Sequence, residues 1–218
     1  MNTRLIIFEG LPGTGKSTAA AMLSAELEKR KIKVFTADEG CEAHPADYKD
    51  YDFPDFETER RMILDKWREF VSIADRETVY VFNCIFLQNP MCEAMMRFAM
   101  SEEKCLEYIS EIADIIKCLD PVIIYIDSEN AKSTVDAVLG ERGNGWLEAV
   151  IDYHTSQGYG KDRGLSGYEG YISCLEERRR RELEILGALE ISSVVTDRKG
   201  ISDIIKTLTE ECLNERNT

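Results

Sequence analysis

Histidine is scarce in this chain, and its cysteines show no paired spacing. Only His44 and His154 are present, so a histidine-based metal centre is not expected. The 7 cysteines are an odd number and include no C-x-x-C pair. This pattern argues against a zinc site or a disulfide framework and predicts reduced thiols in a cytoplasmic protein.

Long apolar runs and an excess of positive charge are also missing. The longest apolar stretches fall well short of a membrane span, and the step from "MNTR" into the first apolar segment leaves no room for a cleavable leader. Lysine and arginine number 27 against 41 aspartates and glutamates, a net charge of −14. Proteins that clamp nucleic acid or bind anionic membranes need positive charge. We therefore expect neither partner, and predict a soluble cytoplasmic protein.

The stretch "FEGLPGTGKST", residues 8–18, carries the clearest chemical signal. From Gly10 to Ser17 it fits G-x-x-x-x-G-K-[ST], the pattern of the phosphate-binding loop (P-loop). An apolar segment over residues 4–9 predicts a strand before the loop, and residues 16–31 predict a helix after it. This context favours the P-loop over the alternative, an incidental glycine turn.

The loop residues predict how a nucleoside triphosphate would be held. Glycines let the backbone wrap closely around an anion, and successive N–H groups at a helix start bind phosphates. Lys16 is expected to reach the β- and γ-phosphates, and the Ser17 hydroxyl to occupy one position on Mg²⁺. The predicted nucleotide-binding residues are Gly10, Leu11, Pro12, Gly13, Thr14, Gly15, Lys16, Ser17 and Thr18.

Strand and helix patterns alternate along the chain, which favours an α/β fold with a parallel sheet and helices on both faces. Strands are predicted over residues 4–9, 31–38, 78–86, 121–127 and 191–197. Beyond the P-loop helix, helices are predicted near residues 57–75, 90–100, 102–119, 131–139, 146–154 and 171–189, with a last one after Gly200. No repeat or low-complexity linker is present, so residues 1–218 are expected to form a single domain.

The run "LIIFEGLPGTGKST" resembles the opening of thymidylate kinases and, more broadly, of the nucleoside and nucleotide kinase group of P-loop proteins. "IIYID", residues 123–127, is similar to the fourth core strand of that group. The resemblance implies a five-stranded parallel sheet, ATP with Mg²⁺, and transfer of the γ-phosphoryl group to a small acceptor. It also implies a substrate-binding excursion over residues 39–75 and an arginine-bearing lid over residues 140–170.

The acceptor side departs from thymidylate kinases. They usually place an Asp-Arg pair at the end of the third strand, where this chain has Asn83 and Cys84. Their Glu-Pro-Gly-Gly turn after the second strand is replaced here by "DEGCEAHPADY". We therefore expect a different acceptor: a nucleobase-containing compound, another metabolite or an antibiotic hydroxyl.

Carboxylates near the loop are the candidates for catalysis and metal binding. Asp38 and Glu39 end the second strand, where kinases of this topology often keep an acceptor-facing carboxylate; either would take the hydroxyl proton, and the alternative is a solvated acidic turn. Glu9 is the predicted metal ligand beside Ser17, through water. Asp127 is a second candidate, equally well placed to cap the following helix.

Arginines in the second half of the chain are candidates for neutralising phosphate charge. Arg142 is the predicted lid cation, because it follows the fourth strand and its helix. Residues 158–170 add Lys161 and Arg163 on a glycine-rich stretch that would close over the phosphates, unless it is an ordinary surface loop.

The run "EERRRR", residues 176–181, has two interpretations. Glutamate–arginine pairs spaced i to i+4 are typical of a solvated helix face. However, Arg178 or Arg179 beside the apolar stripe of this helix would need an anion, and so would reach the active site.

The acceptor pocket is expected between "AHPADY", residues 43–48, and "NCIFLQNP", residues 83–90. His44, Asn83, Gln88 and Arg178 are the predicted substrate-binding residues, with Phe86 as an apolar face. His44 is equally suited to capping a turn.

These observations predict an ATP- and Mg²⁺-dependent phosphotransferase acting on a small hydroxyl- or phosphate-bearing acceptor, with Lys16, Asp38, Glu39 and Arg142 as catalytic residues. The alternative is a regulatory ATPase that acts through a protein partner. The sequence has no Asn-Lys-x-Asp guanine reader and no clear acid at the end of the third strand, which favours the kinase. Kinases of this topology are often homodimers, and no segment here marks an interface.

Overall fold

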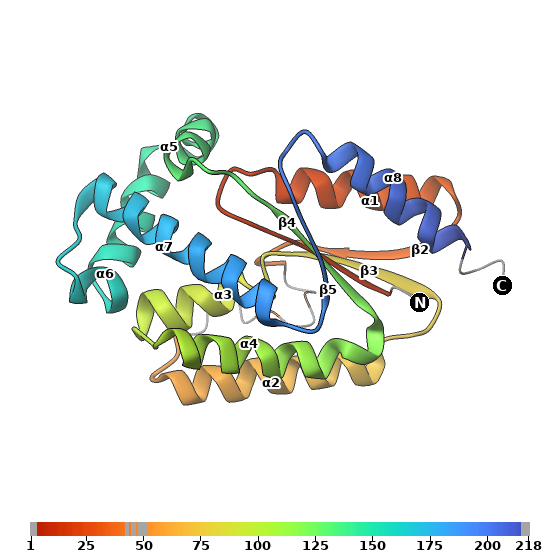
Figure 1. Ribbon diagram of the computed structural model, residues 1–218, viewed down its shortest axis with the longest axis horizontal. Helices are drawn as coiled ribbons and strands as arrows, with labels where there is room; N and C mark the ends of the chain where they lie inside the picture. Colours follow the sequence, from red (N-terminus) through yellow and green to blue (C-terminus); the bar gives the residue numbers. More distant parts are fainter. Residues whose placement is uncertain (1–3, 42–43, 45–46, 48–51, 215–218) are drawn as a thin grey trace.

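Five parallel strands form the central sheet of the protein. The computed structural model describes residues 4–41, 44, 47 and 52–214, and its strand order is β2-β3-β1-β4-β5. The strands are β1 (Leu5–Glu9), β2 (Lys33–Ala37), β3 (Thr78–Asn83), β4 (Pro121–Ile126) and β5 (Ser192–Thr196). The predicted five-stranded parallel α/β sheet is therefore confirmed, with helices on both of its faces (Figure 1).

Helices connect successive strands. In chain order they are α1 (Lys16–Lys29), α2 (Phe56–Ile73), α3 (Gln88–Met91), the π-helix η1 (Cys92–Arg97), α4 (Glu102–Ile116), the 3₁₀-helix η2 (Lys117–Leu119), α5 (Ala131–Thr155), α6 (Gly158–Asp162), α7 (Gly167–Ala188) and α8 (Ile201–Asn214). No helix in the described part of the chain is long and apolar enough to cross a membrane.

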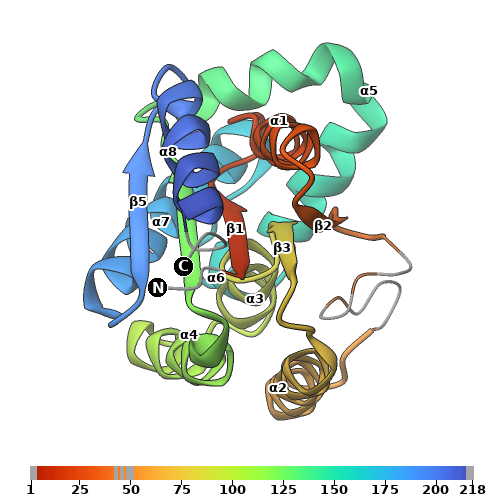
Figure 2. The same ribbon diagram turned by 90° about the vertical axis from the view of Figure 1, so that its right-hand side faces the viewer.

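The sheet separates two apolar layers. Successive side chains of a strand point to opposite faces, so Leu5 and Ile7 of β1 pack with α2 and α4, whereas Ile6 and Phe8 pack with α1 and α8. Figure 2 shows these two helix pairs on opposite sides of the sheet. All residues of β1 and β4 are buried, which explains why every one of them except Glu9 is apolar.

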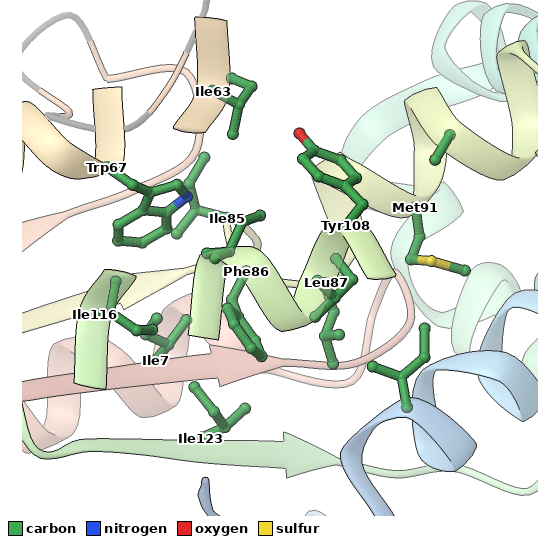
Figure 3. Close-up of a cluster of buried hydrophobic side chains, with 14 of the residues drawn as sticks. Ile7, Ile63, Trp67, Ile85, Phe86, Leu87, Met91, Tyr108, Ile116 and Ile123 are labelled. Atoms are coloured by element: carbon green, nitrogen blue, oxygen red, sulfur yellow. The ribbon is translucent and has the colours of Figure 1, made fainter. Parts of the chain in front are cut away.

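The chain turns sharply after β3. The sequence predicted a strand up to Phe86, which is wrong at its end because Cys84 adopts a positive φ of 61° and breaks the extended conformation. Ile85, Phe86 and Leu87 then point into the core beneath the sheet, near Trp67 of α2 (Figure 3). The turn is thus anchored by apolar side chains directly below the carboxyl end of β3.

The residues between β4 and β5 form a helical layer beside the P-loop. The predicted helices over 131–139 and 146–154 are joined in α5, which bends at Gly143 (φ 78°, ψ 171°). Val135 of α5, together with Tyr171 and Leu175 of α7, packs on Leu11 of the loop. The loop therefore lies between the sheet and this helical layer.

Two glycines of the predicted hinge, Gly158 and Gly160, are tightly packed, whereas Gly164 and Gly167 have no described atom within 4 Å of a Cβ. A Cβ at Gly158 would lie 2.0 Å from the carbonyl oxygen of Met96, and a Cβ at Gly160 would lie 2.1 Å from that of His154. Close approach of backbones, rather than freedom of movement, accounts for these two glycines.

Candidate active site

The P-loop connects β1 to α1 through three glycines with positive φ: Gly10 (136°), Gly13 (82°) and Gly15 (101°). Only glycine adopts such angles without strain. A Cβ at Gly13 would also lie 2.1 Å from the carbonyl oxygen of Thr134. The backbone of the loop therefore depends on glycine both for its path and for its contact with α5.

Lys16 and Thr14 bond to the loop itself. The Lys16 ammonium donates to the carbonyl oxygens of Gly10 and Leu11, both at 2.9 Å, and the side chain is buried. The Thr14 hydroxyl donates to Leu11 at 3.0 Å. Lys16 is thus held against the loop. A bound phosphate would replace the two carbonyl oxygens with charged oxygens, which are stronger acceptors for the Lys16 ammonium.

Asn83 lies beside Ser17, although the sequence analysis assigned it to the acceptor pocket. Its side-chain amide donates to the Ser17 hydroxyl oxygen at 3.0 Å and to a carboxylate oxygen of Asp38. Its Oδ1 accepts the backbone N–H of Glu39 at 3.1 Å. Asn83 is paired with Phe8 at the end of β1, which places it beside the loop, and it is not among the described residues that line the cavity presented below.

Glu9 also differs from its predicted role as a metal ligand. The side chain is fully buried, and it accepts the backbone N–H groups of Phe86, Leu87 and Gln88 at 2.7, 2.9 and 3.1 Å. Burial raises the pKa of this carboxyl to about 7. Glu9 therefore holds the turn after β3, and its oxygens are already occupied by that turn.

The carboxylate of Asp127 is also bonded to another part of the protein. Both of its carboxylate oxygens accept from Arg179, from Nε and Nη2, at 2.6 Å each. Asn130, not Asp127, caps α5 by accepting the N–H of Ser133. Neither the metal role nor the capping role considered for Asp127 matches this bidentate ion pair, which ties β4 to α7.

A cavity of about 770 Å³ opens from the P-loop, within the size range of small-molecule sites. Its walls come from the loop, the ends of β2 and β3, η1, α5, α7 and the segment after β5. The predicted site residues that line it are Pro12, Gly13, Gly15, Lys16, Ser17, Thr18, Glu39, Gln88, Arg142 and Arg178. Gly10, Leu11 and Thr14 are not among its described lining residues.

Asp38 and Glu39, which the sequence did not separate, lie differently. Asp38 is held by Asn83 near Ser17. Glu39 lines the cavity, and one of its carboxylate oxygens accepts from Nε2 of Gln88 at 3.1 Å. The two carboxylates therefore face the loop hydroxyl and the open cavity, respectively.

Two residues predicted for the acceptor pocket lie elsewhere. His44 packs on the ring of Phe82, 4.6 Å between centroids, and burial lowers its pKa to about 4. Phe86 is fully buried in the core (Figure 3). Neither belongs to the described residues that line the cavity. Most of "AHPADY", and residues 42–43, 45–46 and 48–51 of the predicted excursion 39–75, lie outside the described residues.

Arg142 reaches the cavity from α5, with its guanidinium 5.3 Å from the ring centroid of Trp146. Lys161 and Arg163 are not among the described lining residues. Arg163 instead lies over Tyr159, at 3.8 Å. Of the three predicted cations, only Arg142 is therefore among the described residues that line the cavity.

Arg178 is the most enclosed cation of the cavity, with 1% of its surface exposed. Its Nε lies 3.1 Å from a carboxylate oxygen of Glu182, which is itself fully buried. Of the arginine run, Arg178 therefore lines the cavity, while Arg180 forms ion pairs on the outer face of α7.

Arg198, which was not predicted from the sequence, lies beside Gly15 in the segment after β5. A Cβ at Gly15 would be 3.5 Å from its Nε, and the side chain lines the cavity. A signal was available: the carboxyl ends of parallel strands meet at one edge of the sheet, so the "DRKG" segment after the last strand had to lie near the loop.

No cluster of three or more His, Cys, Asp or Glu side chains that would hold a metal on its own occurs among residues 4–41, 44, 47 and 52–214. Mg²⁺ in nucleotide sites is held differently, by one or two protein oxygens plus phosphates and water. Ser17 and Asp38 supply a hydroxyl and a carboxylate of the type that this arrangement requires, joined through Asn83.

Comparisons with known proteins agree with this geometry at the level of the fold. Residues 3–67 match the family model described as "Chromatin associated protein KTI12". The crystal structure of YorR protein from Bacillus subtilis, in complex with phosphorylated GDP, is similar over 98% of each chain, with 18% sequence identity and a TM-score of 0.54. The structure of APE1195 aligns over 98% of this chain and 97% of its own, with 14% identity and a TM-score of 0.45. No curated protein matches the chain.

The family match is confined to the region from β1 to α2, and the structural likeness to YorR extends over the whole chain. The glycine loop, the strand order and these two similarities all indicate the same fold. The protein has the kinase-like fold of the P-loop NTPases.

Proposed function

We propose that the protein transfers the γ-phosphoryl group of a nucleoside triphosphate, with Mg²⁺, to a small acceptor bound in the cavity. One observation carries this proposal: the P-loop and a walled cavity of about 770 Å³ form one continuous site. Phosphoryl transfer depends mainly on positioning and charge neutralisation, and a cavity that shares a wall with the loop places an acceptor beside the phosphates.

The loop side of the site would bind the nucleotide. The backbone N–H groups and Lys16 would hold the phosphates, and Ser17 and Asp38 would hold Mg²⁺, directly or through water. Mg²⁺ neutralises phosphate charge when bound. Asn83 would orient both oxygen ligands, because its amide contacts each of them.

The cavity side would bind and activate the acceptor. Glu39 is the better placed of the two predicted bases, since it lines the cavity beside Gln88 and would accept the proton of the attacking hydroxyl. Arg142 and Arg198 would stabilise the negative charge on the transferred group, from α5 and from the segment after β5.

The fold shared with YorR supports a nucleotide as one ligand, because that protein was crystallised with phosphorylated GDP. The identity of the base stays open between ATP, which we expect, and GTP. A regulatory ATPase acting through a macromolecular partner is the second candidate, and the match of residues 3–67 to the chromatin associated protein KTI12 favours it. The cavity beside the loop favours the kinase.

The proposal is tested by ADP release from the purified protein with Mg·ATP, alone and with pooled acceptors: nucleosides, nucleoside monophosphates, sugars and hydroxylated antibiotics. Lys16→Ala serves as the blank. We expect one pool to stimulate turnover in the natural protein and not in the variant. Slow ADP release that no pool changes, together with stimulation by a protein partner, would support the regulatory ATPase instead.

A further inference from the structure

Three buried side chains in the wall formed by α5 and α7 leave polar atoms without protein partners. His154, Tyr171 and Arg178 are 5%, 0% and 1% exposed, and all three line the cavity. Nε2 of His154, the hydroxyl of Tyr171 and Nη2 of Arg178 have no hydrogen-bond partner in the described part of the chain. Buried polar atoms are almost always bonded, so three unbonded ones in one wall call for a bonding partner.

Arg178 determines the charge of that ligand. Its Nη1 donates to the Cys92 sulfur at 3.1 Å, and thiol sulfur is a weak acceptor. Glu182 forms an ion pair with Nε at 3.1 Å, but these two atoms do not form a hydrogen bond in the described part of the chain. A guanidinium has five donors suited to planar oxyanions, and here Nε and Nη2 are left without a hydrogen-bond partner in the wall of the cavity.

His154 determines a second feature of the ligand. Its Nδ1 lies 2.7 Å from the carbonyl oxygen of Val150, which only accepts, so Nδ1 carries the proton. Burial, reinforced by the charge of Arg178, lowers the pKa of the ring to about 4, and the imidazole is neutral at pH 7. Nε2 is therefore an acceptor and requires a donor, such as a hydroxyl group.

The Tyr171 hydroxyl can both donate and accept a hydrogen bond, whereas Arg178 only donates and Nε2 of His154 only accepts. Its ring packs against His154, with 4.8 Å between centroids. Helix α7 places it two turns before Arg178 on the same wall. The wall thus offers a cation, a hydroxyl and a neutral acceptor to one small molecule.

We propose that this wall is the acceptor subsite, and that the acceptor is a small molecule with an anionic oxygen group, held by Arg178 and Tyr171, and a hydroxyl group that donates to His154. The inference rests on the proposed kinase function and names its substrate class. A carboxylate and a phosphate share the chemistry that Arg178 recognises, and the experiment separates them.

The test is isothermal titration of the full chain with glycerol 3-phosphate, glycerate and glycerol, first without nucleotide and then with saturating Mg·ADP. We expect at least one of the two anionic probes to bind more tightly than glycerol, and binding to persist with Mg·ADP, because the P-loop is then filled. The tighter of the two anions identifies the group. Binding that Mg·ADP abolishes would place the probe in the P-loop and overturn the proposal.

Tyr171→Phe is the most informative variant, because it removes one oxygen atom from a fully buried ring. We expect about tenfold weaker binding of the anionic probe, with thermal stability unchanged or higher, since a buried unbonded hydroxyl is removed. Arg178→Lys should weaken binding at least about tenfold, because lysine cannot form the planar double contact. Arg180→Lys, an exposed position on the same helix, is the matched control.

Anionic probes that bind no better than glycerol, or that bind equally well to Tyr171→Phe and the natural protein, would show that only water fills this wall and would overturn the proposal. Failure of the kinase function is seen separately, as absent Mg·ADP binding or absent transfer from ATP. Probe binding in the nucleotide-free protein reports on the subsite in either case.

Discussion

The side-chain amide of Asn83 donates a hydrogen bond to the hydroxyl oxygen of Ser17 across 3.0 Å. The same amide contacts Asp38, whose carboxylate comes from the end of β2. Where many P-loop ATPases place an acid at the end of the strand next to β1, this protein has a neutral carboxamide. The negative charge near Ser17 is supplied instead by Asp38.

Asn83→Ala is expected to weaken binding of Mg·ADP about tenfold, because Ser17 and Asp38 lose their common donor. Binding of ADP in the presence of EDTA should change little, since the phosphate-binding backbone is untouched. Fluorescent-nucleotide titrations with and without Mg²⁺ measure both. An equal loss in the two conditions would mean that Asn83 supports the loop rather than the metal ligands.

Arg142→Ala is expected to lower the turnover number at least about tenfold, because the proposed function gives this cavity-lining cation the role of stabilising charge on the transferred group. The free energy of unfolding should change by less than about 1 kcal/mol, because the side chain is exposed. Arg163→Ala is the matched control: this arginine also lies over an aromatic ring, and its loss should leave turnover unchanged. Equal effects of the two variants would contradict the role of Arg142.

Glu59 makes the stability of the protein depend on pH. It is fully buried in α2, accepts a hydrogen bond from the Tyr108 hydroxyl at 2.6 Å, and burial raises its pKa from 4.5 to about 8. The folded state therefore keeps a proton that the unfolded state releases, and the contribution of Glu59 to stability, complete below pH 4.5, is lost as the pH rises towards 8.

Glu59→Gln should remove this part of the pH dependence. We expect the variant to gain on the order of 4 kcal/mol relative to the natural protein between pH 4.5 and 8.5, from a shift of that size. Urea unfolding at pH 5 and pH 8.5 measures the difference. A constant difference across this range would show that Glu59 is ionised in the folded protein throughout.

Gly160→Ala is expected to destabilise the protein by about 2 kcal/mol or more, because the new Cβ would lie 2.1 Å from the backbone oxygen of His154. Gly187→Ala, in α7, meets no described atom within 4 Å and should stabilise the helix by roughly 0.5–1 kcal/mol. Thermal unfolding of both variants provides the comparison. Tolerance of alanine at Gly160 would restore the interpretation of this stretch as a flexible hinge.

The fold was predictable because its signals are local. The apolar runs of β1 and β4 and the glycine spacing of the P-loop each lie within a few consecutive residues, and the alternation of strands and helices gives the parallel sheet. The end of β3 was predicted wrongly, since "CIF" is apolar enough for a strand while the positive φ of Cys84 depends on the core beneath it.

Of the candidate site, only the P-loop was predictable, because one short sequence motif contains it. The partners of Asn83 and Glu9 come from segments that are distant in the sequence, so spacing gives no indication of them. His154 and Arg178 meet because α5 and α7 fold back on each other. Pairings of this kind depend on tertiary packing, which a propensity argument does not contain.

The central claim is tested most directly by following the γ-phosphoryl group of labelled ATP in the presence of Mg²⁺ and the anionic hydroxyl compounds proposed as acceptors. The account predicts that the label enters an organic acceptor, and that Lys16→Ala abolishes this transfer. Label found only as inorganic phosphate, at a rate that no acceptor changes, would contradict it and identify the protein as an ATPase.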